Sequence, residues 1–130
     1  MSSDSDRHKR ALQSYKAHRG VDYVAPASPH DPQSIVDLAT MGLDRAYGDS
    51  WSRPGLDFRT KSFVTMTVAA TLGTEEQLRI HIAAAHRLGI SKDELVEWLI
   101  HLNGYIGIMR TNVALRIARD VWAAQAEHKP

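Results

Sequence analysis

The 130-residue sequence contains no cysteine. Disulfides, thiolate catalysis, iron–sulfur clusters and cysteine-ligated zinc are therefore excluded. An excess of one charge sign is also lacking, because 16 Lys and Arg residues are matched by 15 Asp and Glu residues. This balance argues against a nucleic-acid-binding or anionic-membrane surface, since either requires a concentrated basic patch.

Long apolar runs are missing as well. No stretch approaches the roughly 20 apolar residues that a membrane-spanning helix requires. The opening residues, MSSDSDRHKR, lack the apolar core of a secretory signal. We therefore expect a cytoplasmic protein with no membrane partner, and the chain length suits one domain with a substantial core.

Residues 1–30 are predicted to be a polar N-terminal segment and linker, and residues 31–130 a helical domain. The first 20 residues could form a polar helix, but its apolar face is thin, and the following ten contain two prolines and indicate an extended linker. The basic residues of this segment are expected to be solvated. Four histidines in polar or terminal sequence are also predicted to be solvent-exposed: His8, His18, His30 and His128.

Apolar residues recur at helical spacing through the rest of the chain, and no segment alternates as a strand would. Asp31-Pro32 predicts the start of a helix over about 31–47, which Gly48 ends. The next helix follows residue 62, stops at Gly73 and is apolar nearly all round, which predicts a central, buried position.

The second half of the chain carries two capping-box patterns, at Thr74–Gln77 and Ser91–Glu94, and each predicts the start of a helix. A final helix is predicted over about 108–126. The predicted fold is all-α, with five or six helices joined by short loops.

The stretch WSRPGLDFRTKS at residues 51–62 is unusual for a connector, because it combines an indole, a Pro-Gly turn and two arginines. Each side chain has a structural explanation. Trp51 could anchor packing, Arg53 could be a solvated turn residue and Arg59 could pair with Asp57. From composition alone, each of these structural explanations is at least as good as a functional one.

His81 lies in the apolar stripe of its predicted helix, between Leu78 and Ala85. The stripe alone favours a core histidine bonded to a backbone carbonyl over a functional one. His86 follows five residues later and points about 140° away, so the two histidines make a poor metal pair. We expect no metal.

Glu97 precedes His101 by four residues, so the two share a helix face, which suits a carboxylate that orients an imidazole. The alternative is an exposed pair on the surface. Trp98 and Tyr105 lie one turn on either side of His101 and indicate that this flank is buried. The sequence has no G-x-S-x-G, Gly-rich phosphate loop or Rossmann fingerprint.

Three ordered motifs together resemble the carboxymuconolactone decarboxylase family over about residues 33–122. They are W-S-R-P-G-L-D-x-R-T-x-S, then G-T-E-E-Q-L-R-I-H ending at His81, then E-x-x-x-H-x-x-x-Y-x-G-x-x-x-x-N from Glu97 to Asn112. The resemblance implies a compact all-α fold of the alkylhydroperoxidase-D-like type. It also implies homotrimers or homohexamers, with active sites near the subunit interfaces.

The reaction implied by this resemblance is the cofactor-free decarboxylation of a small lactone of the 4-carboxymuconolactone type in aromatic-compound catabolism, or of a related substrate in a paralogue. The implied proton donors are His81 and His101, the latter oriented by Glu97. The residues implied to bind the small anionic substrate are Trp51, Arg53, Arg59, Tyr105 and Asn112. A non-catalytic ligand-binding or scaffold protein of the same fold is the alternative.

The same superfamily includes peroxidases that use C-x-x-C and a nearby histidine. Aligned on His81, those cysteines would fall at Thr74 and Gln77, and the proton-relay glutamate would fall at Ser62. Thiol peroxidase chemistry is therefore not expected. Met109 stands where the family often has proline and Arg110 adds a charge, so a different substrate is compatible with the pattern.

Overall fold

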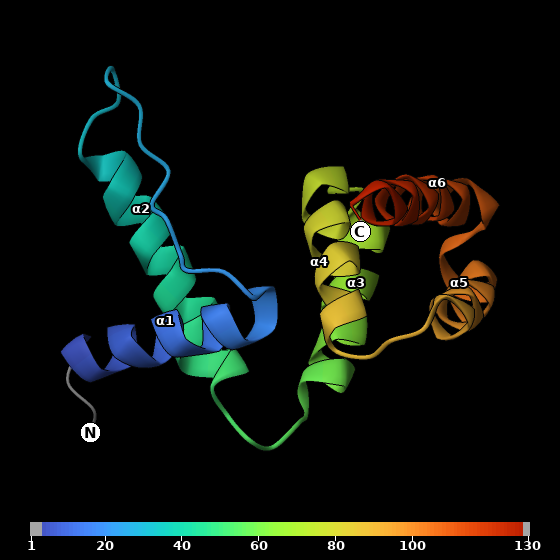
Figure 1. Cartoon of the computed structure of the whole chain (residues 1–130), viewed down its shortest axis with the longest axis horizontal. Helices are drawn as coiled ribbons and strands as arrows, with labels where there is room; N and C mark the ends of the chain where they lie inside the picture. Colours follow the sequence, from blue (N-terminus) through green and yellow to red (C-terminus); the bar gives the residue numbers. More distant parts are fainter. Residues whose placement is uncertain (1–3, 129–130) are drawn as a thin grey trace. The chain divides into compact units, whose positions relative to one another are not determined.

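The computed structural model describes residues 4–128, and within this range the chain forms six α-helices, one π-helix and no strand (Figure 1). The predicted all-α fold is therefore confirmed. Contacts within the chain divide it into two compact units, one up to Asp57 and one from Phe58 onward. The boundary predicted between residues 30 and 31 stays a prediction.

No helix in the described range is both long enough and apolar enough to cross a bilayer.

The first unit contains α1 (Asp4–Arg19), α2 (Ser34–Leu43) and the π-helix η1 (Asp44–Trp51). The helix predicted over about 31–47 therefore starts at Ser34, widens to π winding at Asp44 and continues to Trp51. At its end the Ser52 N–H bonds to the carbonyl of Tyr47, five residues back, at 3.2 Å. The prediction that Gly48 ends this helix was wrong.

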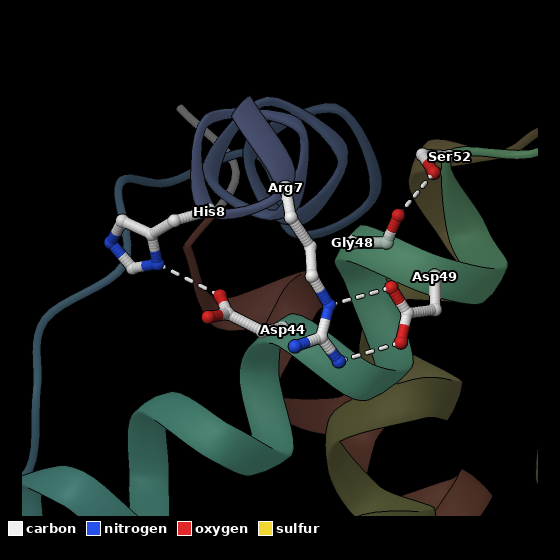
Figure 2. A network of polar contacts seen from close by, with 6 residues as sticks. All are labelled: Arg7, His8, Asp44, Gly48, Asp49 and Ser52. Atoms are coloured by element: carbon white, nitrogen blue, oxygen red, sulfur yellow. Dashed lines mark hydrogen bonds and ion pairs between the residues drawn. The ribbon is translucent and has the colours of Figure 1, made fainter. Parts of the chain in front are cut away.

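Gly48 instead lies where α1 approaches η1 closely. A Cβ at this position would lie 2.9 Å from the Arg7 carbonyl oxygen and 3.4 Å from the Ala11 Cβ. Because only glycine lacks that atom, it permits this approach of two backbones. The Gly48 carbonyl also accepts a hydrogen bond from the Ser52 hydroxyl at 2.7 Å (Figure 2).

Polar contacts reinforce the packing of α1 on η1. Figure 2 shows the Arg7 guanidinium reaching both carboxylate oxygens of Asp49, at 2.7 and 2.6 Å. This bidentate pair lowers the pKa of the Asp49 carboxyl. His8 Nδ1 lies 2.8 Å from Asp44 Oδ1. Arg7 and His8 therefore have partners on η1 that the sequence did not predict, and their side chains remain 36% and 39% exposed.

His18 is fully buried, which contradicts its predicted exposure. Its Nδ1 lies 2.8 Å from the Tyr47 hydroxyl oxygen, and its ring stacks on Trp51 with centroids 4.1 Å apart. Tyr15 packs edge-on against Tyr47, and burial raises the pKa of Tyr47 to about 12. The thin apolar face of α1 is thus completed by rings from η1. His30 and His128 are exposed, as predicted.

The second unit contains α3 (Phe58–Leu72), α4 (Glu75–Arg87), α5 (Lys92–Ile106) and α6 (Ile108–Glu127). Helices α3 and α4 lie side by side, and α6 packs against both α4 and α5 (Figure 1). All four helices contribute to one apolar core, whose most buried large side chains include Met66, Leu78, Ile82 and Ile117. Gly73 ends α3 with φ of +75°, which other residues rarely adopt.

Three predictions for the helices of this unit have different outcomes. The capping box at Ser91 is confirmed, with reciprocal bonds between Ser91 and Glu94. The box predicted at Thr74 is absent, because the Thr74 hydroxyl bonds weakly back to the Ala69 carbonyl at 3.4 Å. Helix α3 is also less buried than predicted, because a second apolar stripe is exposed in the single chain. That stripe consists of Val64, Val68 and Leu72.

Candidate active site

His81 is held on the inner face of α4, where it is only 7% exposed. Leu78 and Ala85, one turn before and one turn after it, are buried on the same side, and the adjacent Ile82 is buried as well. The predicted apolar stripe is therefore present. A buried imidazole in such surroundings has few orientations and little contact with water. Both a core histidine and a positioned acid have these properties, so burial alone does not distinguish the two roles.

Ser62 is a second buried polar residue of this unit. In the alignment on His81, it stands where the related peroxidases have their proton-relay glutamate. It lies on α3, which packs along α4, and is fully buried. Its hydroxyl has no hydrogen-bond partner within residues 4–128. Because an unpaired buried hydroxyl costs about 1–3 kcal/mol, such a group requires an explanation, and a functional role is one. The only sequence signal was a serine at an inward position of an apolar helix.

Glu97, His101 and Tyr105 follow one another along an exposed side of α5. The helix buries Leu95, Trp98, Leu99 and Leu102, and the other three therefore point outward. Tyr105 is 79% exposed, so the prediction that this flank is buried was wrong for the single chain. The His101 and Tyr105 rings lie 5.2 Å apart, but no hydrogen bond joins Glu97 to His101.

The groove that contains Glu97 and His101 is open and acidic. Its lining is Phe63, Asp93, Glu94, Glu97, Trp98 and His101. Glu94 is paired with Arg59, but the carboxylates of Asp93 and Glu97 disfavour the binding of an anion by Coulomb repulsion. In the single chain, the electrostatic surroundings of His101 therefore suit an anionic substrate less well than the apolar surroundings of His81.

Arg59 already has two partners within the second unit. Its Nη1–H donates to the Gly89 carbonyl at 2.9 Å, and its Nη2 pairs closely with the Glu94 carboxylate. The sequence suggested Asp57 as the structural partner, but the observed partner is Glu94, 35 residues away. Glu94 also accepts a hydrogen bond from the Ser91 N–H, and these two contacts, the Ser91 N–H first, lower the pKa of Glu94. Arg59 thus ties the start of α3 to the start of α5.

Trp51 and Arg53 belong to the first unit. Trp51 is the last residue of η1 and is buried against His18 and Tyr47, so it is a packing anchor there. Arg53 lies in the following connector with an exposed side chain, and its backbone N–H donates to the Ser50 carbonyl at 3.0 Å.

Asn112 lies on the outer face of α6, in a shallow hollow that it shares with Arg116 and Arg119. Arg116 pairs with Glu75 of α4 at 2.6 Å. Within the second unit the structure thus brings Glu97, His101 and Tyr105 together along one flank, and it places His81 and Asn112 elsewhere.

A metal centre finds no support in the part of the chain that the structure describes. No group of three or more His, Cys, Asp or Glu side chains there is arranged to hold an ion.

Comparison with known proteins adds a separate line of evidence. The model of the Carboxymuconolactone decarboxylase family matches residues 38–120. The chain is 43% identical over 120 residues to 4-carboxymuconolactone decarboxylase from Acinetobacter baylyi, covering 92% of this chain and 90% of that protein. It is 30% identical over 111 residues to an uncharacterized 15.0 kDa protein in the nqo9-nqo10 intergenic region of Paracoccus denitrificans, covering 84% and 75%. The span matched by the family model includes every predicted site residue.

Proposed function

Because the chain belongs to the carboxymuconolactone decarboxylase family, we propose that it is a decarboxylase acting on a small carboxylated lactone of the 4-carboxymuconolactone type. The observation that carries the proposal is 43% identity to a protein of that name across nearly the full length of both chains. The reaction is a carbon–carbon lyase step in the catabolism of aromatic compounds, and it takes place in the cytoplasm without a cofactor.

The chemistry needs no cofactor because the substrate can accept its own electrons. The bond between the ring carbon and the carboxylate breaks, and CO2 leaves. The electron pair passes into the conjugated lactone carbonyl, and the resulting enolate is then protonated at carbon. The protein must therefore bind the remaining carboxylate, stabilise the developing oxygen charge and supply one proton.

His81 is the proposed proton donor. Its burial in an apolar stripe supports this role, since a desolvated, fixed imidazole transfers a proton to a defined position. Ser62, whose buried hydroxyl has no partner within residues 4–128, is the proposed hydrogen-bond donor to the developing oxygen. His101 and Glu97 are the second candidate acid and its orienting carboxylate, with Tyr105 beside them.

The two arginines of residues 51–62 have different proposed roles. Arg53 binds a substrate carboxylate, because its guanidinium lies on an exposed connector. Arg59 is a positioning residue, because Glu94 and the Gly89 carbonyl already hold it. Asn112 would make a polar contact with the substrate, whereas Trp51 keeps a structural role as the packing anchor at the end of η1.

The active form is proposed to be a homotrimer or homohexamer. The support is the exposed apolar surface of the second unit, which includes Leu72, Ile100, Tyr105 and Met109, the last of these 83% exposed. Burial of such surface is what drives association of subunits. Analytical ultracentrifugation at micromolar concentration tests this, and a stable folded monomer would contradict it.

The deciding experiment measures the turnover of 4-carboxymuconolactone by wild type, His81→Gln and His101→Gln. His81→Gln should fold and assemble normally but lose about 10²–10⁴ in rate, the usual contribution of a positioned acid. His101→Gln should stay within a few-fold of wild type. If His81→Gln mainly loses stability and its folded fraction keeps full activity, His81 is a core residue. If the wild type turns over no lactone acid, the non-catalytic ligand-binding or scaffold alternative holds.

A further inference from the structure

We propose that a cavity in the second unit, separate from the candidate active site, binds a small planar acid: one apolar ring with a single carboxylate. The cavity measures about 190 Å³ and lies among the end of α4, the start of α5 and the end of α6. None of the predicted active-site residues lines it. The proposal does not depend on the decarboxylase activity.

The floor of the cavity is apolar and well packed. Ile82, Ala85, Ile90 and Leu95 form it, and each is at most 5% exposed. An apolar cavity of about 150 Å³ is known to accommodate benzene, so this volume suits one ring with a small substituent. It is too small to receive a helix or a loop of another protein, which favours a small molecule as the occupant.

An aromatic wall and a cation stand beside this floor. Trp122 of α6 lines the cavity, and the Lys92 ammonium lies 5.5 Å from the centroid of its ring. This cation–π contact keeps the positive charge over the ring. No acidic side chain is among the lining residues, so the charge of Lys92 is not cancelled within the cavity. The lining thus differs from the acidic groove at Glu97 and fits an anion.

The start of α5 adds hydrogen-bond donors at the same place. Ser91 lines the cavity, and its oxygen accepts the Glu94 N–H at 3.0 Å, which leaves the hydroxyl hydrogen available to a ligand. The Lys92 N–H belongs to the first turn, where no intrahelical acceptor exists. His86 and Gln125 supply further polar atoms in the lining. These groups would bind a carboxylate while the ring rests on the floor.

Benzoate is the probe, and benzyl alcohol is its uncharged counterpart. Both are titrated into the intact chain, and the tryptophan indole N–H signals are followed by NMR, with Trp122→Phe used to assign the signal of interest. Benzoate should shift the Trp122 signal and leave those of Trp51 and Trp98 in place. Lys92→Gln should weaken benzoate binding by up to about fivefold and leave benzyl alcohol unchanged.

Two further variants control the interpretation. Arg87→Gln removes an exposed cation of the same α4 terminus that does not line the cavity, so benzoate affinity should stay at the wild-type level. Ala126→Leu fills the exposed side of the cavity without altering the core, so both probes should lose binding. The proposal fails if millimolar benzoate leaves the Trp122 signal unmoved, if Lys92→Gln binds benzoate as wild type does, or if Ala126→Leu retains both probes.

Discussion

Gly48 and Gly42 form a matched pair for testing the packing of the first unit. In Gly48→Ala the new Cβ would meet the Arg7 carbonyl oxygen at 2.9 Å, and this oxygen belongs to backbone and cannot rotate away. Overpacking of this kind costs about 1–3 kcal/mol. The helical preference of alanine over glycine returns about 0.5–1 kcal/mol. We therefore expect a net loss between about 0 and 2.5 kcal/mol, with a central value of about 1 kcal/mol.

Gly42 provides the opposite expectation. It lies in α2, and a Cβ there would have no neighbouring atom within 4 Å. Gly42→Ala should therefore gain the full propensity difference of about 0.5–1 kcal/mol. The predicted signs are thus opposite for the same chemical change in two adjoining helices.

Thermal and urea unfolding of the two variants against wild type would decide the question. At about 4 °C per kcal/mol, the melting temperatures should differ from wild type by several degrees in opposite directions. Near-ultraviolet circular dichroism should change in Gly48→Ala, because η1 carries the Trp51 ring that stacks on His18. If both variants gain stability, the close approach of α1 and η1 does not exist in solution.

Three other predictions concern the second unit and the connector. Arg53→Ala should raise KM for the lactone and leave thermal stability within about 0.5 kcal/mol of wild type, whereas Arg59→Ala should lower the melting temperature; the reverse pattern would exchange their roles. Ser62→Ala should be as stable as wild type or more stable, because it removes an unpaired buried hydroxyl, and should lose turnover rate; unchanged kcat would remove Ser62 from the mechanism. The pKa of Glu94 lies below its ordinary 4.5 in the folded state, so the ionised carboxylate stabilises the fold above pH 4.5, and this stabilisation is lost as pH falls. The melting temperatures of wild type and Glu94→Gln should therefore differ at pH 7 and converge near pH 3, and a difference that stays constant would contradict this.

Local patterns predicted much of the second unit correctly. The capping box at Ser91 and the apolar stripe around His81 depend on residues three or four apart, which a sequence displays directly. The stop at Gly73 is likewise local, since this residue adopts a positive φ. These features correctly predicted the end of α3, the start of α5 and the inward direction of His81.

The errors arose where a distant part of the chain supplies the partner. Arg7 meets Asp49 across 42 positions, and Arg59 meets Glu94 across 35, and neither pairing leaves a periodic signal. His18 looked exposed because its sequence neighbours are polar, but rings from η1 bury it. The π winding of η1 was missed for a different reason. The pattern of apolar residues was compared with the period of an α-helix throughout.

The π winding of η1 has a consequence for how relatives of this chain should be aligned. A π turn closes its hydrogen bond over one more residue than an α turn does. Deleting one residue between Asp44 and Trp51 could therefore restore ordinary α winding without breaking the helix, but it would rotate the following indole away from His18. A one-residue gap in this segment would then mark a change in side-chain direction at the start of the connector.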